Sequence, residues 1–350
     1  MAAKAKTEIA AARHTGTLSE IAALVYHHMD LFFSGEKGVP VPYIQGPPGV
    51  GKTDMVIGLA QKFDAMYFDD PLIIKETVDL RGVPYVKDGF TRWAQPDDLP
   101  RGGRWVWHFD EFTQAYQSMQ NASSRIFLAR KLGEYAVPDG VFPVICSNRE
   151  GDKAATHRMA SFLNNRVSHY EIVPSIEDWR GWAMAHGINT RLLAFLMFRP
   201  NLLHDFDPDR PAFPSPRSWA FLSTLLKRVK DEMVMPLAVA TVGPGAAGEF
   251  WPFWRETIDV PSFEDIVSDP LKTPLPKNPA PNYAVAVMIA QRMDAKNSAK
   301  AWQYVGRLSE EYAFLTLYLG MSRQDHRTVM NNGTINVWIN KHPHLMPTGR

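Results

Sequence analysis

The segment from Val39 to Phe63, VPVPYIQGPPGVGKTDMVIGLAQKF, decides the fold. Its first part, Val41 to Gln45, has the apolar character of a short strand, and its last part, Thr53 to Phe63, has apolar residues at helical spacing. Between them the sequence matches GxxxxGK[ST], in which glycines let backbone N–H groups approach phosphate oxygens and the helix start favours an anion. The segment therefore predicts a strand, a phosphate-binding loop and a helix, as in an α/β domain with a parallel sheet flanked by helices.

The loop supplies residues that suit a bound nucleotide. Lys52 adds a positive charge for the β- and γ-phosphates, and the Thr53 hydroxyl suits Mg²⁺. We therefore predict ATP and Mg²⁺ as cofactors. GTP is disfavoured, because we find no guanine-reading NKxD pattern and NKHP at Asn340 lacks the acid. The expected nucleotide-binding residues are Gly46, Pro47, Pro48, Gly49, Val50, Gly51, Lys52, Thr53 and Asp54.

A second apolar run ends in two adjacent carboxylates. RWVWHFDEFTQ, residues 104–114, is typical of a buried strand that stops at Asp110 and Glu111. Taken alone, such a pair is usually a solvated surface feature. A P-loop, however, needs a second strand that ends in an Asp near Mg²⁺, so we expect Asp110 in the metal shell with Thr53. Glu111 is then placed to orient or deprotonate the attacking water, which predicts hydrolysis.

Three further polar residues are candidates for the reaction. VFPVIC, residues 141–146, predicts a strand that ends near Asn148, whose amide suits the attacking water or the γ-phosphate. Arg166 precedes a short β-type segment, and its guanidinium suits the charge of phosphoryl transfer in a neighbouring subunit. Arg217 stands near a helix start capped by Ser215, where an anion would complete the site. A turn, a salt bridge and a solvent-exposed arginine remain the respective structural alternatives.

Taken together, these segments resemble an AAA+ ATPase. GPPGVGKT, FDEFTQA, FPVICSNRE, FLNNRVSHYEI and FPSPRSW are similar, in order and spacing, to its Walker A, Walker B, sensor 1, arginine-finger and sensor 2 segments. Two further stretches, ETVDLRGVPYVKDGFTRWAQPDDLP and RKLGEYAVPDG, resemble the two inserted hairpins of the MoxR branch of the helix-2-insert clade. Relatives of this branch are common in bacterial and phage genomes. The resemblance covers about residues 17–345 and is strongest over 40–220.

The resemblance implies a homo-oligomer, a hexameric ring that couples ATP hydrolysis to remodelling a client or adaptor protein. In this branch such a chaperone often acts on a protein with a von Willebrand factor A domain. The resemblance also suggests that the lid arginine, Arg217, acts across the subunit interface. A DNA-associated motor or loader is the alternative, because related hairpins translocate on nucleic acid. A passive scaffold that hydrolyses ATP slowly is a third possibility.

The pattern along the chain also predicts an order of parts. Asp88-Gly89 and Gly133 supply turns for two hairpins, and aromatic residues of the first hairpin either grip a partner or pack on their own domain. After Pro174 the apolar spacing becomes helical, and a proline-dense stretch follows it. The expected parts are a flexible N-terminus (1–16), a core with hairpin inserts near 83–93 and 131–137 (17–173), a helical lid (174–268), a Pro-rich linker (269–282) and a C-terminal helical region (283–350).

Composition limits the alternatives. Lys and Arg number 38 against 37 Asp and Glu, a net charge of +1, so the chain has no overall basic field of the kind that dominates nonspecific nucleic-acid binding. One cysteine, Cys146, excludes an intramolecular disulfide and suits a reducing compartment, so we expect a cytoplasmic location. The sequence has no run of 18 apolar residues, and no membrane span is expected.

Overall fold

The structure is a computed structural model that describes residues 13–152, 157, 159, 161–323, 325–330 and 332–345. The chain divides into two compact units, Met1–Ser175 with Phe206–Asp209, and Ile176–Asp205 with Arg210–Arg350. Most of the segment 1–16, expected to be flexible, lies outside the described residues. Its end differs from the expectation, because His14–Gly16 form strand β1 and pair with a neighbouring strand of the sheet.

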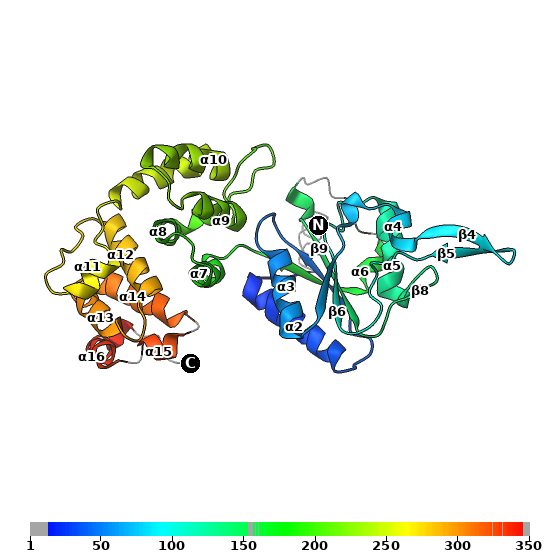
Figure 1. Ribbon diagram of the computed structural model, residues 1–350, viewed down its shortest axis with the longest axis horizontal. Helices are drawn as coiled ribbons and strands as arrows, with labels where there is room; N and C mark the ends of the chain where they lie inside the picture. Colours follow the sequence, from blue (N-terminus) through cyan, green and yellow to red (C-terminus); the bar gives the residue numbers. More distant parts are fainter. Residues whose placement is uncertain are drawn as a thin grey trace, which may run out of the picture. The chain divides into compact units, whose positions relative to one another are not determined.

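The first unit is built on a six-stranded sheet in the order β1-β10-β2-β9-β6-β3, and all neighbours are parallel (Figure 1). Because the strands run in one direction, the segments that follow β2, β6 and β9 meet at one edge of the sheet. The α/β fold class expected from the sequence is confirmed. The strands are β1 (His14–Gly16), β2 (Val41–Gln45), β3 (Met66–Asp69), β6 (Trp105–Phe109), β9 (Val141–Ser147) and β10 (Val167–Ile172).

Helices cover both faces of this sheet. The side chains of β6 alternate, so Val106 packs in the cluster with helices α2 and α3, whereas Trp107 and Phe109 pack with α4, α5 and α6. Thr17 caps α2 in a capping box with Glu20, and the three-residue spacing of these two residue types is typical of that motif. The helices are α2 (Leu18–Phe33), α3 (Lys52–Lys62), α4 (Thr77–Arg81), α5 (Gln117–Ala129) and α6 (Ser161–Asn164).

Two hairpins lie where the sequence predicts them. In the first, β4 (Val83–Lys87) pairs with β5 (Phe90–Ala94), and Lys87 is opposite Phe90. Its two-residue loop is Asp88-Gly89, with φ of 56° and 76°, as a type I′ turn requires. Figure 1 shows this hairpin as an arm that extends away from the rest of its unit. The second hairpin is shorter, turns at Gly133 and consists of β7 (Lys131–Leu132) and β8 (Tyr135–Ala136).

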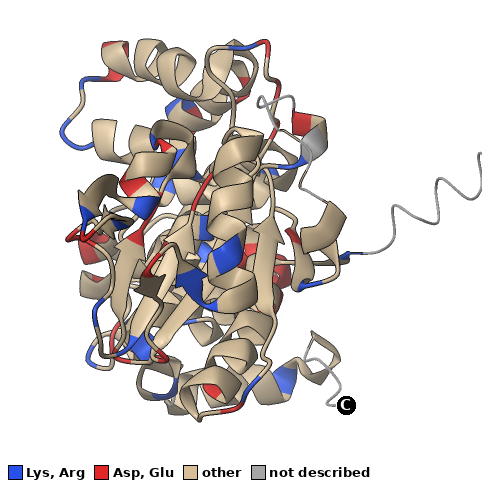
Figure 2. Cartoon of the chain, turned by 90° about the vertical axis from the view of Figure 1, so that its right-hand side faces the viewer, with Lys and Arg blue, Asp and Glu red and all other residues tan. Residues whose placement is uncertain are grey.

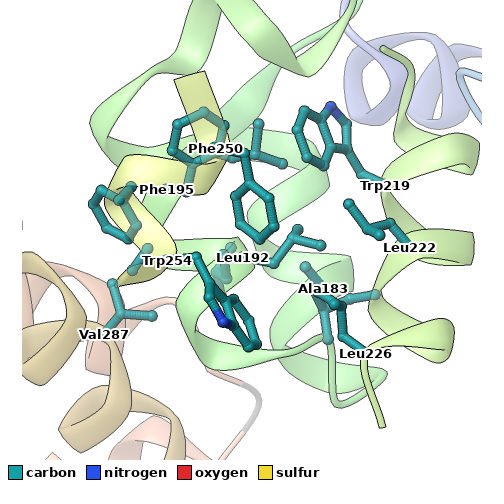
Figure 3. Close-up of a cluster of buried hydrophobic side chains, with 14 of the residues drawn as sticks. Ala183, Leu192, Phe195, Trp219, Leu222, Leu226, Phe250, Trp254 and Val287 are labelled. Carbon is teal, nitrogen blue, oxygen red and sulfur yellow. The ribbon is translucent and has the colours of Figure 1, made fainter. Parts of the chain in front are cut away.

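The second unit is helical throughout the elements assigned to its described residues. Aromatic side chains dominate its first core cluster, where Phe195, Trp219 and Phe250 pack together (Figure 3). A second cluster surrounds Trp302 and Tyr304. The helices are α7 (Ile176–Ala185), α8 (Thr190–Phe198), α9 (Pro216–Leu225), α10 (Asp231–Glu256), α11 (Phe263–Ser268), α12 (Pro279–Arg292), α13 (Ser298–Val305), α14 (Glu310–Met321), α15 (His326–Met330) and α16 (Gly333–Lys341).

Helix α12 joins the two clusters, so the expected division into a lid and a separate C-terminal region is wrong. Ala284 and Val287 of this helix belong to the first cluster, and Val285 and Ile289 belong to the second. The two sets lie on different faces of one helix, which therefore holds both parts in a single compact unit.

Residues 269–282 do not form an extended linker. Pro279 occupies the first turn of α12 after the N-cap Asn278, a position that suits proline because its missing N–H has no partner there. Arg307, which follows α13, binds the loop before α12: its guanidinium donates hydrogen bonds to the carbonyl oxygens of Pro270 and Thr273. The prolines therefore lie in a hydrogen-bonded loop and at the start of a helix, and the extended linker that their number predicted is not formed.

Helix α10 is long and apolar enough, by length and composition, to cross a membrane. Its path is broken at Gly243, where φ is 83° and ψ is 161°, and it contains three prolines. A Cβ on Gly243 would lie 2.6 Å from the carbonyl oxygen of Ala212, so this position requires glycine. Val234, Ala238 and Phe250 of α10 are buried in the first core cluster of this unit, which is the packing of a core helix.

Candidate nucleotide-binding site

The P-loop connects β2 to α3 at the carboxyl edge of the sheet. Gly49 and Gly51 have φ of 78° and 95°, and Gly51 is the N-cap of α3. A Cβ on Gly46 would lie 3.2 Å from Ile172 of β10, so the loop passes close to that strand. The predicted residues 46–54 thus form one loop and the first turn of α3, an arrangement whose backbone N–H groups can surround phosphate oxygens.

Lys52 and Asn148 meet at this edge. The Lys52 side chain is buried, and its Nζ donates to the carbonyl oxygens of Gly46 and Pro47, at 2.8 and 3.1 Å, and to Asn148 Oδ1 at 3.1 Å. Asn148 follows β9, which lies beside β2. A buried ammonium is costly unless its donors have acceptors. These contacts hold the positive charge in place next to the P-loop.

Thr53 and Asp110 also meet, as the sequence predicts. Thr53 Oγ1 donates to Asp110 Oδ2 over 3.2 Å, and the backbone N–H of Glu111 donates to Asp110 Oδ1 over 2.9 Å. A hydroxyl and a carboxylate are the oxygen ligands that Mg²⁺ prefers, so this pair fits the ion. Glu111 has φ of 52°, a conformation that non-glycine residues seldom adopt, and strained backbone conformations cluster at functional sites.

Three residues that the sequence analysis did not select extend this cluster. Asp69 ends β3 and is the register partner of His108 on β6. His108 Nδ1 lies 3.2 Å from Asp69 Oδ1, and the Tyr67 hydroxyl lies 2.7 Å from that nitrogen and donates to the same carboxylate oxygen over 3.2 Å. The ligand atoms of Asp69, His108 and Asp110 all lie within 4.8 Å of one another.

The contacts set the protonation states of this group. The hydrogen bond from His108 lowers the pKa of the Asp69 carboxyl, which is therefore an anion at neutral pH. Burial, and then the negative charge of Asp69, raise the pKa of Tyr67, so its hydroxyl keeps its proton. A carboxylate only accepts hydrogen bonds, and Asp69 thus receives one from the imidazole and one from the phenol.

Arg166 lies at the amino ends of the strands, opposite the carboxyl ends where the P-loop lies. It is exposed and directly precedes β10, where Val167 is beside Val41, whereas the P-loop follows Gln45 at the far end of β2. At about 3.3 Å per residue, the four steps from 41 to 45 span about 13 Å. The structure therefore does not bring Arg166 to the P-loop of its own chain.

Arg217 belongs to the second unit. It is exposed in the first turn of α9, after the N-cap Ser215 and the proline at N1, as the sequence predicts for this helix start. The N-cap Ser215 and Ser218 form a capping box, so the backbone N–H of Ser218 in the first turn of α9 has the Ser215 hydroxyl as its acceptor.

Charge is mixed on the face drawn in Figure 2. Lys and Arg are scattered among Asp and Glu over the helices and strands of that view. The distribution agrees with the net charge of +1 and gives that face no field of a single sign.

No family model and no curated protein match the sequence. Among solved structures, the chain is similar to the RuvB Holliday junction branch migration motor of Thermotoga maritima, with 12% identity, a TM-score of 0.38 and 69% of each chain covered. A substituted form of that RuvB gives 11% identity and a TM-score of 0.37 over 65% of this chain and 66% of the other. NtrX of Brucella abortus in complex with ATP gives 15% identity and a TM-score of 0.39 over 91% and 72%. Because these TM-scores are below 0.5, the fold class rests on the strand order and the P-loop: an α/β P-loop NTPase sheet flanked by helices and followed by a helical unit.

Proposed function

We propose that the protein is an ATP-hydrolysing AAA+ ATPase of the MoxR-like branch, a hexameric ring in the cytoplasm that remodels a partner protein. One observation supports the ATPase part of this proposal. Lys52, Thr53, Asp110 and Asn148 come from three separate segments of the chain, and the bonds from Lys52 to Asn148 and from Thr53 to Asp110 join them at one sheet edge. These are the residue types that phosphoryl transfer from ATP requires.

The roles of the residues follow from their contacts. The three acceptors described above for Lys52 are neutral oxygens, and the γ-phosphate is a stronger acceptor for its ammonium group. Thr53 and Asp110 would hold Mg²⁺, which neutralises negative charge on the phosphate oxygens when it is bound. Glu111 accepts a proton from the attacking water, and the Asn148 amide orients that water.

The position of Arg166 supports a ring. Arg166 lies at the amino ends of the strands, whereas its own P-loop lies at their carboxyl ends. This arginine therefore serves phosphoryl transfer only if the amino-end side of one subunit meets the carboxyl-end side of the next subunit. A contact between two different surfaces is heterologous, and heterologous contacts form a ring when the rotation from one subunit to the next closes. Arg166 then stabilises charge on the nucleotide of its neighbour. We assign the less direct role across the same interface to Arg217.

The first hairpin is the candidate contact with the client. Val86 is 79% and Phe90 67% exposed near its turn, and Tyr85 is also exposed. Strand register places Tyr85 and Phe90 on one face of the arm and Val86 on the other, so the tip presents apolar groups on both faces. Exposed apolar groups near one tip mark it as an interaction site. Trp93 differs from Phe90, because it is only partly exposed and lies 4.3 Å from the Arg81 guanidinium, which packs over its ring. We therefore assign client contact to the tip and packing to Trp93. The resemblance makes a von Willebrand factor A protein the preferred client.

A trapped complex tests this function. Glu111→Gln should bind ATP without turnover and retain its client, so affinity capture with ATP, followed by mass spectrometry and an assay for nucleic acid, identifies what is bound. Lys52→Ala, which should not bind ATP, is the matched control. A von Willebrand factor A protein enriched only in the trap supports the proposal. Bound DNA together with DNA-stimulated ATPase activity would instead show a DNA-associated motor, and ATP binding with neither partner would favour a passive scaffold.

A further inference from the structure

Asp69 lies at the carboxyl ends of the strands, as Asp110 does, although its strand β3 is the outermost strand of the sheet. Strands β3 and β6 are paired in the register Asp69 to His108, and side chains alternate along a strand, so Asp69 and His108 point to one face of the sheet. Thr53 of α3 reaches Asp110 at this same edge. The ligand atoms of Asp69, His108 and Asp110 are within 4.8 Å of one another, which makes the two carboxylates close neighbours.

His108 is an unusual side chain for its place. It is fully buried on β6, the strand next to the outermost strand β3, where the apolar cluster contains Val106 and Val144. Burying an imidazole is costly unless it is hydrogen-bonded, and the partners of Nδ1 are Asp69 and the Tyr67 hydroxyl. The Asp69 side chain is 48% exposed, so water alone would solvate it. The hydrogen bond from the buried His108 imidazole fixes the direction of the Asp69 carboxylate, which solvation by water would leave free to rotate.

Two carboxylates this close repel each other, and a cation between them removes the repulsion. Mg²⁺ is commonly held by one or two carboxylates together with the phosphates of a nucleotide. We infer that Asp69 is a second carboxylate of the divalent-cation site beside Asp110, and that His108 and Tyr67 are positioning residues that hold it there. The inference rests on the proposed ATPase function, because the ion enters with the nucleotide.

Cation dependence of nucleotide binding tests this inference without relying on turnover. All variants carry Glu111→Gln, so that ATP is bound and not consumed, and a fluorescent ATP analogue is titrated at a series of Mg²⁺ concentrations. Asp69→Asn should raise by about tenfold the Mg²⁺ concentration at which the affinity for the ATP analogue has half of its full increase. The asparagine amide has the shape of the aspartate side chain but lacks its negative charge. Its affinity for the analogue in excess EDTA should stay within about twofold. Electron paramagnetic resonance of Mn²⁺ bound with the nucleotide gives a second, direct measure of cation affinity.

The controls separate this inference from the proposed function. Asp64→Asn removes an exposed carboxylate of the same unit at a positive φ that asparagine tolerates, so its Mg²⁺ dependence should equal that of the parent. Asp110→Asn should raise the requirement at least as much as Asp69→Asn. If the Asp110 variant shifts and the Asp69 variant matches Asp64→Asn, the inference fails and the ATPase stands. If the parent shows no Mg²⁺-dependent ATP binding, both fail.

The supporting side chains have their own test. His108→Leu removes the imidazole and should raise the Mg²⁺ requirement severalfold, whereas His108→Asn retains an N–H donor and should recover part of the loss. Tyr67→Phe deletes a single hydroxyl that contacts both partners, so it gives the same readout even if His108→Leu does not fold. An unchanged Mg²⁺ requirement in the folded Tyr67→Phe and His108→Asn variants, and in His108→Leu if that variant folds, would overturn the positioning role.

Discussion

Lys52 Nζ donates a hydrogen bond to Asn148 Oδ1 over 3.1 Å, and this contact joins two residues that are 96 positions apart in the chain. It connects the start of α3 with the tip of β9, the strand that lies beside β2. The groups expected to bind the phosphate and to orient water therefore lie in contact with each other, and such fixed placement of polar groups is the preorganisation that catalysis by charge requires.

Lys52→Ala should abolish detectable ATP binding at micromolar nucleotide, because the variant lacks the ammonium charge beside the phosphates. Lys62→Ala is the matched control, since Lys62 is an exposed lysine in the last turn of the same helix and should leave affinity unchanged. Isothermal titration with ATP and Mg²⁺ measures both. Equal affinities for the two variants would refute the P-loop assignment.

Glu111→Gln should keep ATP affinity within a few-fold and lower turnover by about 10²- to 10⁴-fold, because the amide cannot accept the proton of the attacking water. Phosphate release under saturating ATP gives the rate, and filter binding gives the affinity. Glu36→Gln, at an exposed site after α2, should behave as the parent. Hydrolysis at the parent rate by the Glu111 variant would contradict the assignment of the two carboxylates.

Arg166→Ala should lower turnover by about 10³-fold with little effect on nucleotide affinity, because the arginine acts on the transition state of a neighbouring site. The sharper experiment mixes two inactive proteins, Arg166→Ala and Glu111→Gln, under conditions where subunits exchange. Some interfaces in a mixed ring then contain both original groups, so activity should return.

Rings that are demonstrably mixed but stay inactive would count against a shared site. Strict coordination around the ring gives the same result, and doping each variant with the parent protein distinguishes the two: strict coordination predicts a loss of activity steeper than the fraction of variant subunits.

Phe90→Ala combined with Val86→Ala should leave basal ATPase activity within about twofold and weaken client binding at least tenfold, because both side chains are exposed and lie within two residues of the hairpin turn. Trp93→Ala is the contrasting variant: it removes the ring under Arg81 and should lower the melting temperature. Client capture at the parent level by the tip variant would exclude the tip as the contact.

Gly82→Ala should destabilise the base of the hairpin by on the order of 2 kcal/mol. Gly82 has φ of 84°, and a Cβ there would lie 1.8 Å from the carbonyl oxygen of Ala94. Gly89→Ala is the control, because its φ of 76° is similar but no atom lies within 4 Å of the added Cβ. Hydrogen exchange over residues 83–94 should rise more for Gly82→Ala, and the reverse order would contradict the described base of the hairpin.

Local features could be predicted because their causes lie within a few residues. The P-loop follows from glycines next to a lysine and a helix start, the cap of α2 from Thr17 and Glu20, and the hairpin turn from Asp88-Gly89. The same reasoning failed for the proline-dense stretch, because proline is equally suited to an extended linker and to the first turn of a helix. Contacts with Arg307 and the packing of α12 made that choice.

By itself, the sequence determined which residues could perform the chemistry: Lys52, Thr53, Asp110, Glu111 and Asn148 each end a strand or begin a helix, and local pattern identifies such positions. The tertiary structure alone decided which of them meet. Strand order places β9 beside β2 and joins Asn148 to Lys52, the register of β3 with β6 adds Asp69 to the cluster, and strand direction puts Arg166 at the opposite edge. Pairing between strands depends on side chains that are distant along the chain and packed on both faces of the sheet, and no short segment contains that information.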